Sequence, residues 1–212
     1  MCFQDEKDFT LQVPKNTQND RIYIKGKKAN VSAKRLYHGR NKFSKKIMVS
    51  CVVCYEGVSQ PFFMNPEKTK VNGENYTNHL ETDLLPECRL LCGLDFIYVH
   101  DGAPSHTSAV CQNFLRANLG DNFISKEMWP PYSPDCSPLD YYFWDALSNQ
   151  VYLGRTEPFE NLEELKQRII AVWDDAIDLV ALRKALDQFR PRLRAVVKTK
   201  GKSIKAFFGK KD

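Results

Sequence analysis

The sequence predicts an α/β domain in which a mixed five-stranded sheet is flanked by helices. Its 212 residues are 42% hydrophobic and include 13 Phe, enough to form a full core. Strand-like segments come first and then alternate with helical ones, an order typical of layered α/β domains. The run 96–99 is continuously apolar, as in central strands that are buried on both faces.

Five segments have the pattern of strands: residues 2–4 (with 9–13 as a continuation), 47–55, 58–64, 94–101 and 122–127. Glu56-Gly57 separates the second and third segments and predicts a hairpin. The first strand is expected to be shortened, close to the minimum length of a strand.

Helices are predicted over residues 75–85, 105–118, 138–152, 161–176 and 181–197. Pro86 is expected to end the first of them, and Pro191 to interrupt the last. Ser105 is the expected N-cap of the second, with Gly120 just past its end. Pro138 is expected to begin the third.

Positive charge is concentrated in two segments, although the formal net charge is only +5. Residues 15–46 hold eleven Lys and Arg against one acid, and residues 190–212 hold nine against one. The remaining residues, 11 basic and 24 acidic, are negative overall. Basic segments that flank an acidic body favour a polyanionic partner, while a solvated basic loop plus a disordered tail is the alternative. The candidate nucleic-acid-binding residues are Lys25, Lys27, Lys28, Lys34, Arg35, Lys45, Lys46, Lys198, Lys200 and Lys202.

The seven cysteines and the lack of an export signal or long apolar run favour a soluble, intracellular protein with free thiols. Cys51-Val-Val-Cys54 and Cys88-Arg-Leu-Leu-Cys92 raise the alternative of a zinc site. Against zinc, residues i and i+3 of a strand point to opposite faces, and no compact second pair follows at the usual spacing. Neither a membrane nor a small-molecule substrate is expected as a partner.

Three acids occupy positions that suit a metal site. Asp101 ends a buried strand, where side chains leave the core but stay rigidly aimed, although it could simply cap the next helix. Asp140 lies in the first turn of a helix and heads the stripe of Trp144, Leu147 and Val151, so we expect it to point toward the sheet and away from water. The helix dipole alone also favours an acid there. Asp5 is the natural third member.

Neighbouring acids are weaker candidates. Asp135 precedes a Pro-containing turn and is most simply a turn or cap residue. Asp145 is expected to face solvent, and Glu6 to point away from Asp5. Carboxylates from three separate elements can bind two Mg²⁺ or Mn²⁺ ions, which would support in-line phosphoryl transfer. Spacing alone does not identify the trio, because 26 acidic residues offer many combinations.

Three motifs resemble the catalytic domain of Tc1/mariner-type transposases: Phe3-Gln-Asp-Glu-Lys7, His100-Asp-Gly-Ala-Pro-Ser-His106 and Pro131-Tyr-Ser-Pro-Asp-Cys-Ser-Pro-Leu-Asp-Tyr-Tyr142. The resemblance covers roughly residues 2–155. It implies a ribonuclease H-like fold over 1–155, with 14–46 as a basic loop insertion, 156–197 as a C-terminal helical extension and 198–212 as a basic flexible tail.

The same resemblance implies metal-dependent DNA cleavage and strand transfer in the nucleus, with Asp5, Asp101 and Asp140 as the catalytic and metal-binding residues. It favours Asp140 over Asp135 as the third acid. The 38 residues between Asp101 and Asp140 exceed the mariner spacing, which we interpret as an insertion near 119–128. DNA is the expected partner, and a homodimer is compatible with the sequence.

The helix-turn-helix modules of such transposases have no counterpart before Asp5. We therefore expect nonspecific cutting and no authentic transposition by this chain. The alternative function is a non-catalytic, nucleic-acid-binding remnant of a degenerate or domesticated transposon.

Overall fold

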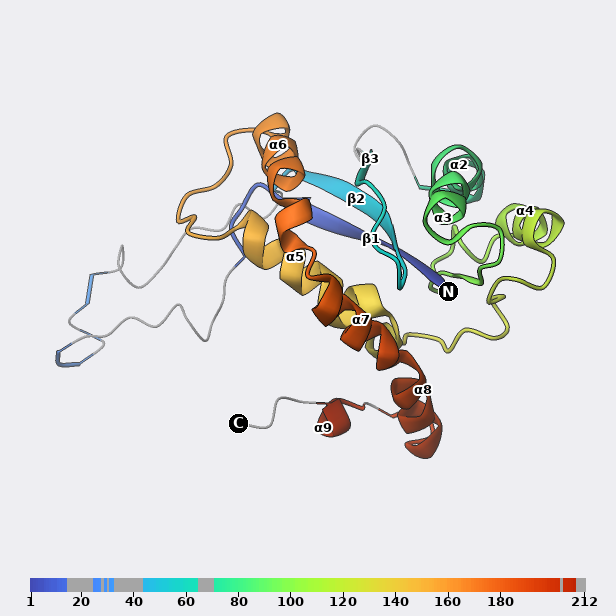
Figure 1. The fold of residues 1–212 in the computed structure, drawn as a ribbon. Helices are drawn as coiled ribbons and strands as arrows, with labels where there is room; N and C mark the ends of the chain where they lie inside the picture. The colour runs from blue at the N-terminus through green and yellow to red at the C-terminus, as the bar shows by residue number, and fades with distance from the viewer. Residues whose placement is uncertain are drawn as a thin grey trace.

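The fold is a mixed β-sheet with helices on both faces, seen in a computed structural model that describes residues 1–14, 25–27, 29, 31–32, 44–64, 71–202 and 204–208 (Figure 1). Within these residues the sheet has four strands in the order β3-β2-β1-β4: β1 (Cys2–Thr10), β2 (Lys46–Val53), β3 (Phe62–Met64) and β4 (Tyr98–Val99). The predicted α/β class is confirmed, whereas the predicted number of five strands was wrong.

β1 is the central strand and is not shortened, since it extends over nine residues. It pairs antiparallel with β2, where Asp5 faces Cys51, and parallel with β4, where Phe3 faces Val99. Alternate residues of β1 therefore enter two different layers of the protein. β2 and β3 form the predicted hairpin.

The fifth predicted strand, at 122–127, is reduced to one parallel bridge between Tyr98 and Phe123. The N–H of Tyr98 donates to the carbonyl of Asn122, and the N–H of Ile124 donates to the carbonyl of Tyr98. The central segment 94–101 likewise contributes only the two residues of β4. Pairing stops there because the chain turns away at Asp101, whose side chain binds the following turn.

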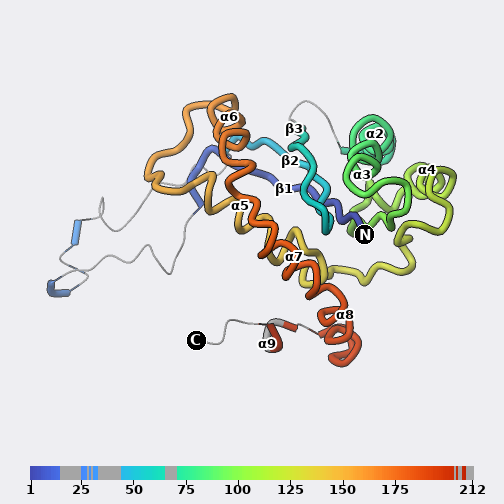
Figure 2. Tube along the Cα trace, viewed as in Figure 1, coloured from blue at the N-terminus to red at the C-terminus, as the bar shows by residue number. Residues whose placement is uncertain are grey.

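Two groups of helices cover the two faces of the sheet (Figures 1 and 2). One face is covered by α2 (Gly73–His79), α3 (Leu85–Cys92) and α4 (Ala109–Leu119). The other is covered by the π-helical turn Leu139–Phe143, α5 (Trp144–Val151), α6 (Leu162–Val172), α7 (Leu179–Asp187) and α8 (Phe189–Lys198). Short 3₁₀ turns at Pro134–Cys136 and Asp174–Ala176 and the final helix α9 (Lys205–Phe208) complete the elements.

Both prolines expected to break helices are accommodated. Pro86 lies in the first turn of α3, directly after the π-helical turn Leu80–Leu84, so its missing N–H falls where the hydrogen-bond register changes. Pro191 lies in the first turn of α8, and the break between α7 and α8 falls earlier, at Gln188. Pro191 therefore loses no intrahelical hydrogen bond, and Pro86 is tolerated inside a continuous helical segment at the point where its register changes.

α4 also begins later than expected. Its N-cap is Ser108, whose side chain accepts a hydrogen bond from the N–H of Cys111, and Ser105 is buried in the preceding turn. Gly120 ends the helix as predicted.

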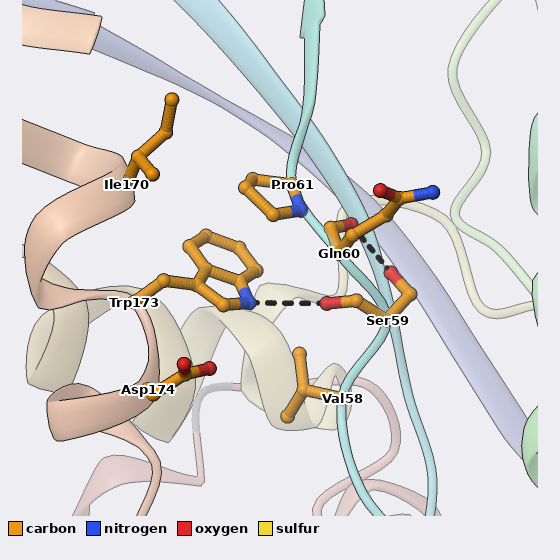
Figure 3. A pocket seen from close by; sticks show the side chains of 7 residues that line it. All are labelled: Val58, Ser59, Gln60, Pro61, Ile170, Trp173 and Asp174. Atoms are coloured by element: carbon orange, nitrogen blue, oxygen red, sulfur yellow. Dashed lines mark hydrogen bonds between the residues drawn. The ribbon is translucent and has the colours of Figure 1, made fainter. Parts of the chain in front are cut away.

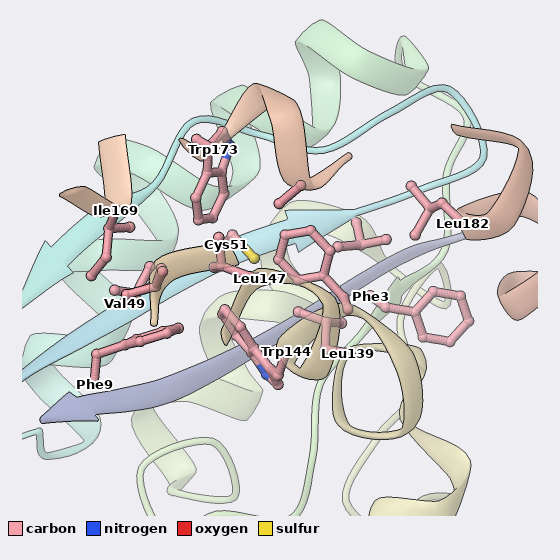
Figure 4. Packing of buried hydrophobic residues seen from close by; sticks show 14 of the residues in the cluster. Phe3, Phe9, Val49, Cys51, Leu139, Trp144, Leu147, Ile169, Trp173 and Leu182 are labelled. Carbon is pink, nitrogen blue, oxygen red and sulfur yellow. The ribbon is translucent and has the colours of Figure 1, made fainter. Parts of the chain in front are cut away.

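The larger core lies under α5 and α6, where side chains from β1 and β2 meet Trp144, Leu147 and Ile169 (Figure 4). α7 adds Leu182 to the same core. Beyond α8 the buried Ile204 precedes α9, and the guanidinium of Arg192 lies over the ring of Phe208. No helix in the described ranges is both long and apolar enough to cross a membrane.

Candidate active site

Asp5 and Asp101 project from neighbouring parallel strands onto the same face of the sheet. Phe3 and Val99 are paired in the β1–β4 register, and each aspartate lies two residues after its member of that pair. Residues two apart share a face, and adjacent strands lie about 4.8 Å apart. The two aspartates therefore lie on the same face of the sheet near the carboxyl end of β4, under the helical segment that begins at Leu139.

Asp5 is 8% exposed and is anchored to the helix layer. Nε1 of Trp144 donates a hydrogen bond of 2.8 Å to its Oδ2. Burial, and then the negative charges of Asp140 and Glu6, raise the pKa of Asp5 to about 8. A carboxyl group in this position is costly to ionise unless a cation accompanies it.

Asp140 is the second residue of the helical segment that begins after Pro138. The stripe that follows it is buried as predicted: Trp144, Leu147 and Val151. Asp140 itself is exposed, so the expectation that it is turned away from water was wrong. It heads the helix and therefore lies at the rim of the core, where partial desolvation and the charge of Asp101 raise its pKa to about 6, with Lys7 opposing them.

Asp101 is held by the turn that follows β4. Its Oδ1 accepts hydrogen bonds from the N–H of Ala103 at 2.9 Å and from Nδ1 of His106 at 2.7 Å. Burial would raise the pKa of Asp101, but the hydrogen bond and charge of His106 outweigh it and lower the pKa. In the described part of the chain Oδ2 accepts no hydrogen bond, so one oxygen is left available.

His106 connects Asp101 to Glu6, whose side chain lies on the face of β1 opposite to Asp5. Its Nε2 lies 3.4 Å from Oε2 of Glu6, while Nδ1 binds Asp101. Burial would lower the pKa of His106, but the two carboxylates raise it to about 10. The imidazolium is thus a buried cation between two acids. Sequence reasoning assigned His106 no role, although it is the second histidine of the motif that contains Asp101.

A buried polar layer supports this histidine. The hydroxyl of Tyr76 lies 2.7 Å from Oε1 of Gln4, 3.1 Å from the hydroxyl of Tyr98 and 3.2 Å from Nδ1 of His100. The rings of His100 and His106 stack with centroids 4.9 Å apart. Burial and the charge of His106 lower the pKa of His100 to about 3, so one ring is neutral and its neighbour charged.

The competing acids occupy structural or exposed positions. Asp135 lies in a 3₁₀ turn, and its backbone carbonyl accepts a hydrogen bond of 3.0 Å from Nη1 of Arg192. Asp145 is exposed, as predicted.

The three candidate acids approach one another without forming a tight cluster. Within the described ranges, only Cys2, Cys54 and Cys92 place three metal-ligand atoms within 4.8 Å of one another. The carboxylates are nevertheless coupled, since Asp140 raises the pKa of Asp5 and Asp101 raises that of Asp140. Hard carboxylate oxygens with mutual repulsion fit a divalent cation such as Mg²⁺ or Mn²⁺.

The ten candidate nucleic-acid-binding residues fall into three groups. Lys28, Lys34 and Arg35 lie outside the described residues. Lys46 forms an ion pair with Asp8. The exposed members are Lys25, Lys27, Lys45, Lys198, Lys200 and Lys202.

A shallow pocket lies away from these acids, between α6 and the segment that joins β2 to β3 (Figure 3). Trp173 and Ser59 both line the pocket, and Nε1 of Trp173 donates a hydrogen bond of 3.1 Å to the carbonyl of Ser59. Val58, Pro61 and Ile170 give it mostly apolar walls. It contains none of the three aspartates.

Comparison with known proteins gives a consistent set of relatives, although no family model matches the chain. The Tc3 transposase of Caenorhabditis elegans is 27% identical over 136 residues, which cover 64% of this chain and 39% of that protein. The Mos1 mariner transposase of Drosophila mauritiana is 28% identical over 81 residues, 37% of this chain and 22% of that protein. The chain thus spans less than half the length of these curated relatives.

Solved structures of Mos1 share the fold. A Mos1 paired-end complex with the left transposon end superposes with a TM-score of 0.75 and 24% identity, covering 95% of this chain and 55% of that one. The isolated Mos1 catalytic domain superposes with a TM-score of 0.64 and 20% identity, covering 96% and 83%. The homologues of this chain are therefore Tc1/mariner transposases, and its α/β fold is that of the Mos1 catalytic domain.

Proposed function

We propose that this chain is the catalytic domain of a Tc1/mariner-type transposase that cleaves DNA strands and transfers them through Asp5, Asp101 and Asp140. The observation that carries the proposal is the electrostatic coupling of these carboxylates where β1, β4 and the helix after Pro138 meet. A protein domain gains no stability from carboxylates that raise one another's pKa. Such an arrangement is expected where function needs a cation.

Mg²⁺ or Mn²⁺ would be held by the same three aspartates, and we propose two ions. Mos1 structures described as complexes with Mg and with Mn are among those that share this fold, which supports the choice of metal. When bound, such ions lower the pKa of an attacking water or hydroxyl group and stabilise the leaving oxygen.

The protein's own groups orient the acids. Trp144 fixes the Oδ2 atom of Asp5 from α5. Ala103 and His106 both bind Oδ1 of Asp101, which leaves Oδ2 available for a cation. Hydrogen bonds from outer residues to ligating carboxylates are common in metal sites, where they fix geometry.

DNA phosphates would be bound by exposed lysines on two parts of the surface. One set, Lys25 and Lys27, belongs to the segment between β1 and β2, and the other, Lys198, Lys200 and Lys202, to the end of α8 and its extension. Contacts of this kind supply affinity and its salt dependence without reading sequence. Lys46 would first have to leave Asp8.

A plasmid-nicking assay tests the proposal. Asp140→Asn and Asp101→Asn should reduce nicking of supercoiled DNA in Mg²⁺ or Mn²⁺ to the level measured with chelator. Asp145→Asn is the matched control, since it changes an exposed acid five residues from Asp140, and it should nick like the unmodified chain. Asp135→Asn should also retain activity.

Equal residual nicking by the unmodified chain and Asp101→Asn would overturn the catalytic proposal. DNA binding that persists without metal-dependent nicking would instead show a binding module. Transfer of a precut 3′-hydroxyl end into a target plasmid, assayed separately, tests the second step.

A further inference from the structure

Four cysteines gather on the sheet face opposite the candidate active site. The Sγ atoms of Cys2, Cys54 and Cys92 all lie within 4.8 Å of one another, and those of Cys2 and Cys92 are 3.3 Å apart. Cys88 lies one helical turn before Cys92 on α3 and is fully buried. Its thiol also interacts with that of Cys2. These residues come from three separate parts of the chain.

Each part holds its sulfur on fixed backbone. Cys2 opens β1, and its N–H donates to the carbonyl of Ile97 at 2.8 Å. Cys54 follows β2 in a tight turn, where its N–H donates to the carbonyl of Gly57 at 2.8 Å and its carbonyl accepts from the N–H of Gly57. Cys92 is the last residue of α3, which Gly93 ends with a φ of 71°. Figures 1 and 2 show the N-terminus beside α3.

The spacing of the sulfurs suits a metal ion better than it suits ordinary core packing. Zinc binds thiolates at about 2.3 Å in a tetrahedron, which places neighbouring sulfurs about 3.8 Å apart. The observed sulfurs, between 3.3 Å and 4.8 Å apart, bracket that value. A core of small apolar groups has no need to bring three thiols together. Cys51, for example, is buried alone among hydrophobic side chains on the other face (Figure 4).

The cluster is also accessible to a cation from one side. Cys2 and Cys54 are fully buried, whereas Cys92 is only partly buried and leaves one side open. The spacing of Cys51 and Cys54 first suggests a ligand pair, but their side chains lie on opposite faces of the sheet. The cluster therefore combines Cys54 with Cys2 and with the cysteines of α3.

We propose that Cys2, Cys54, Cys88 and Cys92 form a tetrahedral thiolate site for a zinc-class cation. Binding forms four metal–sulfur bonds and releases the four thiol protons to solvent, with no change of oxidation state. The ion would cross-link the start of the central strand to the turn after β2 and to α3. It would stabilise the strand that carries Asp5 without contacting the acids.

The direct test is metal analysis and cobalt titration of the full chain. The chain purified under reducing conditions should contain one zinc per molecule. After zinc removal, Co²⁺ should give a sulfur-to-cobalt charge-transfer band with tetrahedral d–d bands. Carboxylate sites do not give the charge-transfer band, so the candidate active site cannot imitate this signal. Zinc and spectrum should both persist in Asp101→Asn, which separates this proposal from the catalytic one.

Matched variants locate the ligands. Cys54→Ser should abolish zinc retention, while Cys51→Ser, an equally buried cysteine three residues earlier in β2, should keep it. Cys88→Ser should weaken retention and alter the d–d bands. Absence of both zinc and the charge-transfer band in the folded unmodified chain would overturn the proposal. So would full zinc retention by Cys54→Ser, or a Cys2–Cys92 disulfide found by peptide mapping of freshly purified protein.

Discussion

Nε1 of Trp144 donates a hydrogen bond of 2.8 Å to Oδ2 of Asp5, and this bond joins the central strand to α5 across the buried core. Both side chains are almost fully buried. One end of the contact is a candidate metal ligand and the other is a core residue, so the packing of α5 and the chemistry of the acid are linked.

Removing the donor with Trp144→Phe should therefore have two effects. Leaving a buried carboxyl oxygen unpaired should lower the free energy of unfolding by about 1–3 kcal/mol. The pKa of Asp5 should rise above about 8, because the hydrogen bond that is removed favours the ionised form. Chemical denaturation and NMR titration of the carboxyl carbon measure the two effects.

Trp173→Phe is the control, since it removes an indole that donates to the backbone carbonyl of Ser59. It should destabilise the chain but leave the titration of Asp5 unchanged. An equal shift of the Asp5 pKa in both variants would contradict the specific link to Trp144.

Asp5 should make the metal-free domain less stable as the pH rises. The folded state holds the proton of Asp5 up to about pH 8, whereas an ordinary aspartate loses it near 3.8. Between these values the folded state binds more protons, so stability falls with rising pH by at most about 1.4 kcal/mol per pH unit. Saturating Mg²⁺ should offset this loss. Thermal unfolding measured across this pH range, with and without Mg²⁺, checks both statements.

Asp5→Asn should remove this part of the pH dependence and stabilise the metal-free chain at pH 8 by about 1 kcal/mol or more. It should also abolish stabilisation by Mg²⁺ and nicking. His106 contributes to the slope that remains in the variant between pH 6.5 and about 10, because its raised pKa favours the folded state below that window. Buried thiols such as Cys51, whose pKa burial raises, add to the slope above about pH 9. A variant that is less stable than the unmodified chain at pH 8 would contradict the unfavourable ionisation of Asp5.

Glu6→Gln should lower the pKa of His106 from about 10, because Glu6 is the largest influence that raises it. Asp101 remains bonded to Nδ1, so the ring should stay in place. NMR titration of the imidazole follows the change directly. Glu81→Gln alters an exposed acid of the π-helical turn and should leave His106 unaffected. An unchanged His106 titration in Glu6→Gln would disprove the bridge.

Replacing Lys198, Lys200 and Lys202 with Gln should weaken DNA binding uniformly across sequences. For each DNA phosphate that the variant no longer neutralises, the slope of log affinity against log salt should decrease in magnitude by about 0.9. Because all three side chains are exposed, thermal stability should not change. Lys126→Gln combined with Lys184→Gln is the control on other exposed surfaces. Fluorescence anisotropy at several salt concentrations measures the slope, and a triple variant with an unchanged slope would exclude this surface from DNA binding.

The sequence predicts features that depend on local patterns. The hairpin at Glu56-Gly57 follows from the turn residues between two strand-like runs, and the buried stripe after Asp140 follows from helical spacing; the structure confirms both. The motifs also select Asp5, Asp101 and Asp140, which the structure brings to one region.

Features that depend on tertiary context were missed. Pro86 and Pro191 do not end helices, because each lies in the first turn of a helix. The preceding π-helical turn places Pro86 there, and the end of α7 at Asp187 places Pro191 there; residue composition reveals neither feature. The strand expected at 122–127 shrinks to a bridge, since pairing depends on how far β4 extends. The role of His106 depends on a contact with Glu6, a residue of β1 that is distant in the sequence. The cysteine cluster likewise requires three distant segments to meet.

Asp5 and Glu6 point to opposite faces of β1, so the function depends on the pairing register of this strand. Asp5 faces Trp144, while Glu6, the next residue, faces His106. A one-residue slip of β1 would turn each side chain to the opposite face of the sheet. Asp5 would then face away from Trp144, and Glu6 away from His106. Deleting a single codon between Cys2 and Asp5 should thus be far more damaging than most substitutions there, and natural variation in this strand should proceed by replacement and not by changes of length.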